Sequence, residues 1–225
     1  MHAGDRPLRE INAEIRSAVG AGKDIRVTEP LSRHNLGVAL PAGGAVTFQG
    51  SVGYYCGGLN NGATITITRN AGWGLGEAMA RGHITVEGNA AMSVGASIRG
   101  GTIHVRGNAG PRCGVAMKGG VIVVEGSLGY ACGFMAHGGR VICLGDTDDA
   151  AGDSLWSGEI WVAGTIRGLG VDARVEEPTA QEVTQVEALL DGLGLRDDER
   201  AWKRIVSAQA LWHFKSREAQ QWLMI

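Results

Sequence analysis

Cysteine and histidine carry the most reactive side chains of this sequence, which has four cysteines and six histidines. Metal sites built from these residues usually bring pairs of ligands together at short spacings. No CxxC or HxxxH pair occurs here, and the histidines are scattered. Cys113 and Cys132 recur at the same spacing as several glycines. The sequence therefore predicts no metal site, and we assign no catalytic and no cofactor-binding residue.

Two short motifs resemble ligand-binding loops. The stretch "GWGLGE", Gly72 to Glu77, contains a GxGxG, but no helix pattern follows it to bind a phosphate at a helix N-terminus. The acidic stretch "GDTDDAAGD", Gly145 to Asp153, is similar to calcium-binding β-roll repeats, but those repeats recur every nine residues. We interpret the first motif as a glycine corner and the second as a solvated corner.

The composition narrows the classes of protein that this chain belongs to. It has 225 residues, 44% of them hydrophobic, so that it can bury a substantial core. Its net charge of −2, with signs that alternate along the chain, does not favour binding to nucleic acid or to an acidic membrane. We see neither a signal peptide nor an apolar run of membrane-spanning length, and we expect a cytoplasmic protein.

Glycine recurs with a fixed period. There are 37 glycines against 5 prolines, without the G-X-Y period of collagen. One set recurs at every 19th position and is predicted to form the structural corners of a winding chain: Gly57, Gly76, Gly95, Gly114, Gly133 and Gly152. Two further glycine columns run through residues 82 to 158 and 88 to 164. Three columns indicate three recurring corners, at which a residue without a Cβ is favoured.

A short strand with alternating side chains lies between the second and third glycine columns of each repeat. Ile65, Ile84, Ile103 and Ile122 occupy one column, and valines or isoleucines occupy the next column but one. We expect both columns to face inward. Because like residues align from repeat to repeat, the sequence predicts an all-β fold, a right-handed parallel β-helix of about seven 19-residue coils.

The 19-residue period also assigns the cysteines to a column. Cys56, Cys113 and Cys132 share a column with Leu75 and Val94, which is typical of an interior position. Neighbouring coils are about 5 Å apart, so a disulfide between Cys113 and Cys132 is sterically possible. In a cytoplasmic protein, buried free thiols are the simpler interpretation.

Segments with helical patterns flank the repeats. Residues 1–23 are predicted to be an N-terminal helix and cap, residues 24–170 the β-helix, and residues 171–225 a helical tail that docks on partner subunits. Leu8, Ile11, Ile15 and Val19 lie on one helical face. Near the other end, Thr179 and Glu182 form the pattern of a capping box.

Apolar residues also occur on the outward side of the last coils. Four of them form what we call the outer ridge: Val123, Ile142, Leu144 and Trp161. Three tryptophans lie in the tail: Trp202, Trp212 and Trp222. We predict all seven as a candidate partner interface, because contiguous apolar surface usually marks a contact. The C-terminal helices of the chain itself are the other candidate cover for the ridge.

The repeats "IHVRGNAGPRCGVAMKGG" and "IVVEGSLGYACGFMAHGG" resemble a known family. This is the GXGXG repeat domain found in the glutamate synthase large subunit and in the C subunit of formylmethanofuran dehydrogenase. The resemblance covers residues 24–170. The flanking stretches "REINAEIRSAV" and "WKRIVSAQALWHF" are similar to the free-standing version, the B subunit of N-methylglutamate synthase and related systems.

The resemblance implies a non-catalytic scaffold within an enzyme complex. The partners that it implies are a glutaminase-type amidotransferase subunit and an FMN-containing synthase subunit with an iron–sulfur cluster, while this chain binds no cofactor itself. Two alternatives stay open. One is the C subunit of a formylmethanofuran dehydrogenase or formyltransferase-type complex. The other is an independent β-helix enzyme or binding module, which needs carboxylates clustered on one outer wall.

Overall fold

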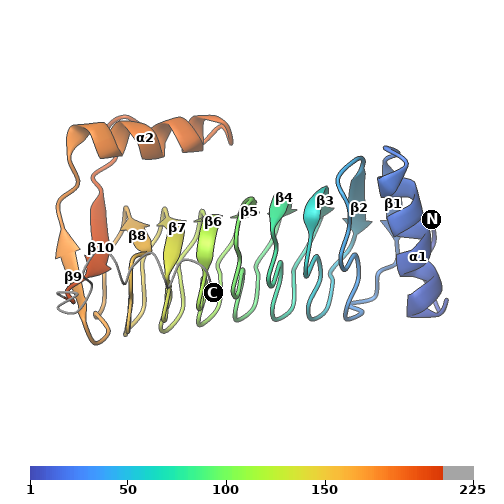
Figure 1. Ribbon diagram of the computed structural model, residues 1–225, viewed down its shortest axis with the longest axis horizontal. Coiled ribbons are helices and arrows are strands. Elements are labelled where there is room, and N and C mark those ends of the chain that lie inside the picture. Colours follow the sequence, from blue (N-terminus) through green and yellow to red (C-terminus); the bar gives the residue numbers. More distant parts are fainter. Residues whose placement is uncertain (210–225) are drawn as a thin grey trace, which may run out of the picture.

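A computed structural model of the chain describes residues 1–209. It confirms the predicted β-solenoid, which has about seven turns and two helices, α1 (Leu8–Gly20) and α2 (Ala180–Asp191) (Figure 1). Ten strands form one sheet along the solenoid. They are β1 (Ile25–Thr28), β2 (Ala45–Gln49), β3 (Asn61–Ile67), β4 (Arg81–Val86), β5 (Thr102–Val105), β6 (Lys118–Val124), β7 (Gly138–Cys143), β8 (Glu159–Val162), β9 (Ala173–Glu176) and β10 (Lys203–Ser207).

Strands β1 to β8 are parallel, and each pairs with the next in chain order. From β3 to β6 the register joins Ile65 to Ile84, Ile84 to Ile103 and Ile103 to Ile122. These isoleucines are buried, as are Phe48 and the valines of the second predicted column. The inward direction of both columns is thus confirmed, and the core is a stack of matching aliphatic side chains.

A second contact line joins the coils on another side of the solenoid. Val52, Ala71, Ala90, Ala109 and Leu128 form successive parallel bridges, again one coil apart. Between this line and the sheet, the turn segments are also bonded from coil to coil, for example from the Gly114 N–H to the Val94 carbonyl at 2.8 Å. Each coil is therefore hydrogen-bonded to its neighbours all round its circumference.

The corner glycines lie in the left-handed region. Gly114 has a φ of +72°, and a Cβ added to it would lie 2.8 Å from Cγ2 of Val141 in the core. At Gly95 an added Cβ would lie 2.5 Å from Cδ1 of Ile122. At both glycines the obstacle to a side chain is a core residue. Glycine is therefore needed at these corners for two reasons: the backbone φ is positive, and the core leaves no space for a side chain.

A ladder of short polar side chains runs along a different corner. The Oδ1 atoms of Asn70, Asn89 and Asn108 accept hydrogen bonds of 2.8 to 2.9 Å from backbone N–H groups one coil further along the chain. Each of these amides thus bonds to the coil that follows it. The ladder therefore adds side-chain bonds between coils to the backbone bonds of the sheet.

The two ends of the solenoid differ. At the first end, α1 packs Ile11, Ile15 and Val19 against the core, and all three are fully buried. At the other end, β10 pairs antiparallel with both β8 and β9, so that it lies between them. Strand β10 was not foreseen in a tail that we predicted to be helical. Within residues 1–209, no helix is long and apolar enough to cross a membrane.

Candidate interaction surface

Helix α2 covers the outer ridge, together with the segment that follows it. Val123, Ile142 and Trp161 are buried in a small second core with Val186 and Leu190 of α2, and Trp202 and the partly buried Leu144 complete it. Figure 1 shows α2 lying over the coils at the C-terminal end of the solenoid. The structure thus provides the intramolecular cover, one of the two covers that the sequence left open.

This cover removes most of the candidate partner interface from the surface. Val123, Ile142, Trp161 and Trp202 are inside the chain, where they pack with Val186 and Leu190 of α2. Trp212 and Trp222 lie outside the described residues.

A buried carboxylate holds the segment after α2 in place. Glu187 is 2% exposed, and its Oε1 accepts hydrogen bonds from Nη1 of Arg200 at 3.0 Å and from Nε1 of Trp202 at 2.8 Å. Its Oε2 accepts from the Asp197 N–H at 2.9 Å. The Arg200 guanidinium also lies 5.3 Å from the centre of the Trp202 ring. A charge this deeply buried is tolerated because both of its oxygens are bonded.

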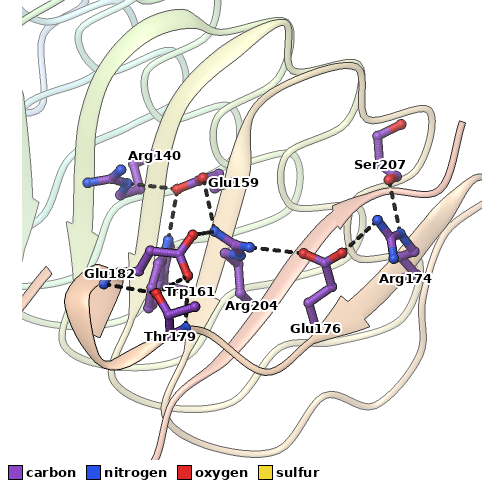
Figure 2. Close-up of polar contacts among 9 residues, drawn as sticks. All are labelled: Arg140, Glu159, Trp161, Arg174, Glu176, Thr179, Glu182, Arg204 and Ser207. Carbon is purple, nitrogen blue, oxygen red and sulfur yellow. Dashed lines mark hydrogen bonds and ion pairs between the residues drawn. The ribbon is translucent and has the colours of Figure 1, made fainter. Parts of the chain in front are cut away.

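A second polar cluster joins α2 and β10 to the solenoid (Figure 2). Arg204 of β10 contacts Glu176 at 2.9 Å, Glu159 at 3.5 Å and Glu182, and its guanidinium lies 5.8 Å from the Trp161 ring centre. Glu159 also accepts a hydrogen bond from Nε1 of Trp161 at 3.1 Å. These contacts join β8, β9, β10 and the start of α2, which fixes the antiparallel strand on the last coil.

Glu182 belongs to this cluster and to the predicted capping box, whose two hydrogen bonds with Thr179 are both present. The backbone N–H and the side chain of Thr179, and then Arg204, lower the pKa of Glu182 below its usual value. A carboxylate with a lowered pKa stabilises the fold above the ordinary carboxyl pKa, and the contribution is lost as the pH falls through the lowered value.

Few other features of the described surface suggest small-molecule chemistry. A shallow depression of about 300 Å³ lies beside the outer ridge and is lined by Arg140, Ser157 and Glu159 among others. The Nε of Arg140 donates to Glu159 at 2.9 Å, so both charges are already paired. His104 is buried and contacts Glu125 at 2.8 Å. Within residues 1–209, no three acidic, His or Cys side chains are grouped closely enough to hold a metal ion.

The four cysteines are buried and free, so the disulfide that the sequence left open is not formed. Desolvation by burial raises the pKa of Cys132 and of Cys143 to about 12, and it raises the pKa of Cys113 well above its usual value. Since the thiolate is the reactive form, these side chains are inert in the folded chain.

This burial predicts the outcome of a labelling experiment. At pH 8 and without denaturant, iodoacetamide should modify fewer than about one in ten of the thiols in the time that fully labels a model thiol. Complete labelling in guanidinium chloride, measured by mass spectrometry, is the control. Rapid native labelling of Cys113 or Cys132 would contradict the interior placement of this column.

An uncovered row of apolar side chains runs along the corner at which the turn segments begin. We call it the aromatic stripe. Its residues lie three positions before Gly37 and before the corner glycines from Gly57 to Gly133, and they are His34, Tyr54, Trp73, Met92, Pro111 and Tyr130. Tyr54, Trp73 and Tyr130 are 44%, 50% and 51% exposed. We did not predict this row from the sequence, although it has the same period as the glycines.

The first three side chains of the aromatic stripe are stacked. The ring centres of His34 and Tyr54 are 4.2 Å apart, and those of Tyr54 and Trp73 are 4.8 Å apart, with nearly parallel planes. The Tyr54 N–H donates to Nδ1 of His34 at 2.8 Å, which orients the imidazole. Because the backbone beneath is bonded from coil to coil, the stripe is a preordered apolar surface of the kind that marks contacts between proteins.

Comparisons with known proteins agree with the fold. The family model described as "GXGXG motif" matches residues 26–191. The curated Protein GlxC of Rhizobium meliloti (strain 1021) is 37% identical over 60 residues, which are 26% of this chain and 26% of that protein. A chain of the formyltransferase/hydrolase complex (FhcABCD) from Methylorubrum extorquens, solved with methylofuran, superposes with a TM-score of 0.66 and 24% identity. The superposition covers 77% of this chain and 68% of that one.

Proposed function

Since this chain belongs to the GXGXG motif family, we propose that it is a non-catalytic scaffold subunit of a multi-subunit enzyme complex. More finely, we propose the B subunit of an N-methylglutamate synthase or a related glutamate synthase-like enzyme. In this proposal a glutaminase-type amidotransferase subunit and an FMN-containing synthase subunit, which also holds the iron–sulfur cluster, carry the chemistry.

The aromatic stripe is the observation that carries the proposal. Exposed rings stacked at 4.2 and 4.8 Å on a backbone bonded from coil to coil form a rigid apolar surface, which suits the docking of another subunit at a fixed position. An enzyme active site would instead need reactive groups that converge on a cleft. In the described surface the depression beside the outer ridge has its Arg and Glu paired with each other. The stripe therefore supports binding rather than catalysis.

The similarity to a chain of the formyltransferase/hydrolase complex favours a second candidate, a subunit of a complex of that type. It shares the scaffold role and differs in the partners.

Purification from the source cells, followed by reconstitution, separates the two candidates. The first predicts that the tagged full chain brings down a yellow FMN protein and an amidotransferase in fixed ratio, both identified by mass spectrometry. The three together should form N-methylglutamate from methylamine. A formyltransferase or hydrolase partner would support the second candidate instead, and turnover by this chain alone would contradict both.

Substitutions in the aromatic stripe test its role in assembly. We expect the pair Tyr54→Ser and Trp73→Ser to weaken association with the FMN subunit at least tenfold, because two stacked side chains leave the contact. Leu189→Ser, which removes an exposed apolar side chain from α2, is the matched control and should leave association unchanged. Equal affinities of all three chains in titration calorimetry would remove the stripe from the interface.

A further inference from the structure

Basic side chains lie in a row along another corner of the solenoid, at which the turn segments end and the chain returns to the sheet. Arg99, Lys118 and His137 occupy the same position in three successive coils, and all three are exposed. The Lys118 N–H donates to the Ile98 carbonyl of the preceding coil at 2.7 Å. Because the coils are bonded in this way, the row holds its side chains at the coil spacing of about 4.8 Å. We call these three residues the basic corner.

The positive charge of the basic corner is not neutralised by its surroundings. Within residues 1–209, the side chains of Arg99 and Lys118 have no ion pair and no hydrogen bond. The residue two positions before each member of the row is Ser, Ala or Met, and the residue directly after each one is Gly. At the other end of the strands, by contrast, Arg106 pairs with Glu87 at 2.9 Å. The basic corner therefore suits a partner of opposite charge, although the net charge of the chain is −2.

An apolar column runs alongside the basic corner. Val115 and Phe134 lie three positions before the last two members of the row and are partly exposed, and Met135 beside them is 46% exposed. Trp156 continues the row after His137 and is 39% exposed, with the two ring centres 6.4 Å apart. The surface thus has a cationic side and an apolar side, and aromatic, Met and Arg side chains together are typical of surfaces that bind proteins.

The chain's own helix α2 shows how a helix fits on this solenoid. It lies lengthwise along the coils (Figure 1), with its apolar face on the outer ridge and Glu182 in contact with Arg204. One helical turn advances by about 5.4 Å and one coil by about 4.8 Å, so successive turns meet successive coils. Carboxylates four residues apart on a helix therefore match Arg99 and Lys118 on adjacent coils.

We propose that the basic corner and the apolar column beside it bind an acidic amphipathic helix of a partner protein, which lies along the solenoid axis. Its carboxylates pair with Arg99 and Lys118, and its apolar face packs on Val115, Phe134 and Met135. The occupant is a protein rather than a nucleic acid, because apolar side chains take up half of the surface and leave few cations for phosphates. The site lies apart from the aromatic stripe, which runs where the turn segments begin. This inference does not depend on the proposed enzyme complex.

Photo-cross-linking of the full-length chain tests this site. A cysteine introduced by Met135→Cys accepts a benzophenone maleimide, whereas the native cysteines are buried. The tagged, labelled chain is mixed with an extract of the source cells, irradiated and purified, and the linked peptide is sequenced by mass spectrometry. We expect one partner protein, linked through a peptide with apolar residues at helical spacing and with Asp or Glu four residues apart. Leu31→Cys, at a 61% exposed position near the other end of the solenoid, is the reference and should not give this adduct.

Charge reversal tests the ion pairs. Arg99→Glu together with Lys118→Glu should lower the yield of the Met135→Cys adduct at least tenfold, because like charges then face each other. The matched pair Arg26→Glu and Arg69→Glu changes the net charge equally at exposed arginines elsewhere, and it should leave the yield unchanged. Circular dichroism shows whether both chains keep the fold.

Four results would overturn the proposal. The first is an equal yield of adduct from the two charge-reversed chains, and the second is a linked peptide without acidic residues. The third is a link to a second copy of this chain, or an adduct that nuclease removes, which assigns the surface to self-association or to a nucleic acid. The fourth is a yield from Met135→Cys no higher than that from Leu31→Cys.

Discussion

Gly114→Val is expected to lower the free energy of unfolding by roughly 2–5 kcal/mol. Gly114 has a φ of +72°, where a β-branched residue is strained by about 1–2 kcal/mol. Its Cβ would also lie 2.8 Å from Val141 and 3.1 Å from Sδ of Met117, and overpacking of this kind costs about 1–3 kcal/mol. Urea denaturation followed by circular dichroism measures the change.

Gly22→Val separates the two contributions to this loss. Gly22 has the same φ as Gly114, +72°, but no atom lies within 4 Å of a Cβ added to it. The substitution therefore adds the backbone strain without the interior clash, and we expect a loss of about 1–2 kcal/mol. If both variants were equally stable, the space around Gly114 would not be as tight as the structure has it.

The second large effect is expected at Glu187. Removing its carboxylate by Glu187→Ala leaves the guanidinium of Arg200 and Nε1 of Trp202 without their acceptor in a buried place. Breaking a buried ion pair in this way costs about 3–5 kcal/mol. We expect this loss in the free energy of unfolding, with a red shift of tryptophan emission as Trp161 and Trp202 become hydrated.

Two variants control the Glu187 prediction. Glu187→Gln keeps an oxygen acceptor and should lose less than Glu187→Ala, while Glu177→Ala removes an exposed carboxylate near α2 and should stay within about 0.5 kcal/mol of the parent chain. A Glu187→Ala chain as stable as the Glu177→Ala chain would show that the buried cluster does not hold α2 on the outer ridge.

The coils could be predicted because each one repeats the same physical problem. Ile65, Ile84 and Ile103 recur at one spacing. A fixed period of short alternating strands predicts coils that stack on one another, and this period can be read from one sequence. The corner glycines follow the same period. The close contact between Val141 and a Cβ added at Gly114 could not be predicted, because it depends on the direction in which that Cβ points.

The C-terminal part depends on contacts without a period, and there prediction was incomplete. The capping box of Thr179 and Glu182 predicted the start of a helix, but nothing local determines whether this helix covers the outer ridge or a partner does. Strand β10 is short and pairs with β8, although β9 and α2 lie between the two strands in the sequence. Arg204 stabilises that pairing through ion pairs with carboxylates from three segments. These ion pairs follow no period or local motif, so the sequence does not predict them.

The antiparallel insertion of β10 also determines the order of folding. Adjacent coils join residues that are one repeat apart, so each coil can form soon after the ribosome releases it, and structure can propagate from α1 onward. The pairing of Val162 with Lys203 must wait until β9, α2 and β10 have all been made, and it closes last. Before these elements are made, Trp161 lacks the side chains of α2 and Trp202 that bury it, so we expect the partly synthesised chain to expose an apolar surface that favours aggregation.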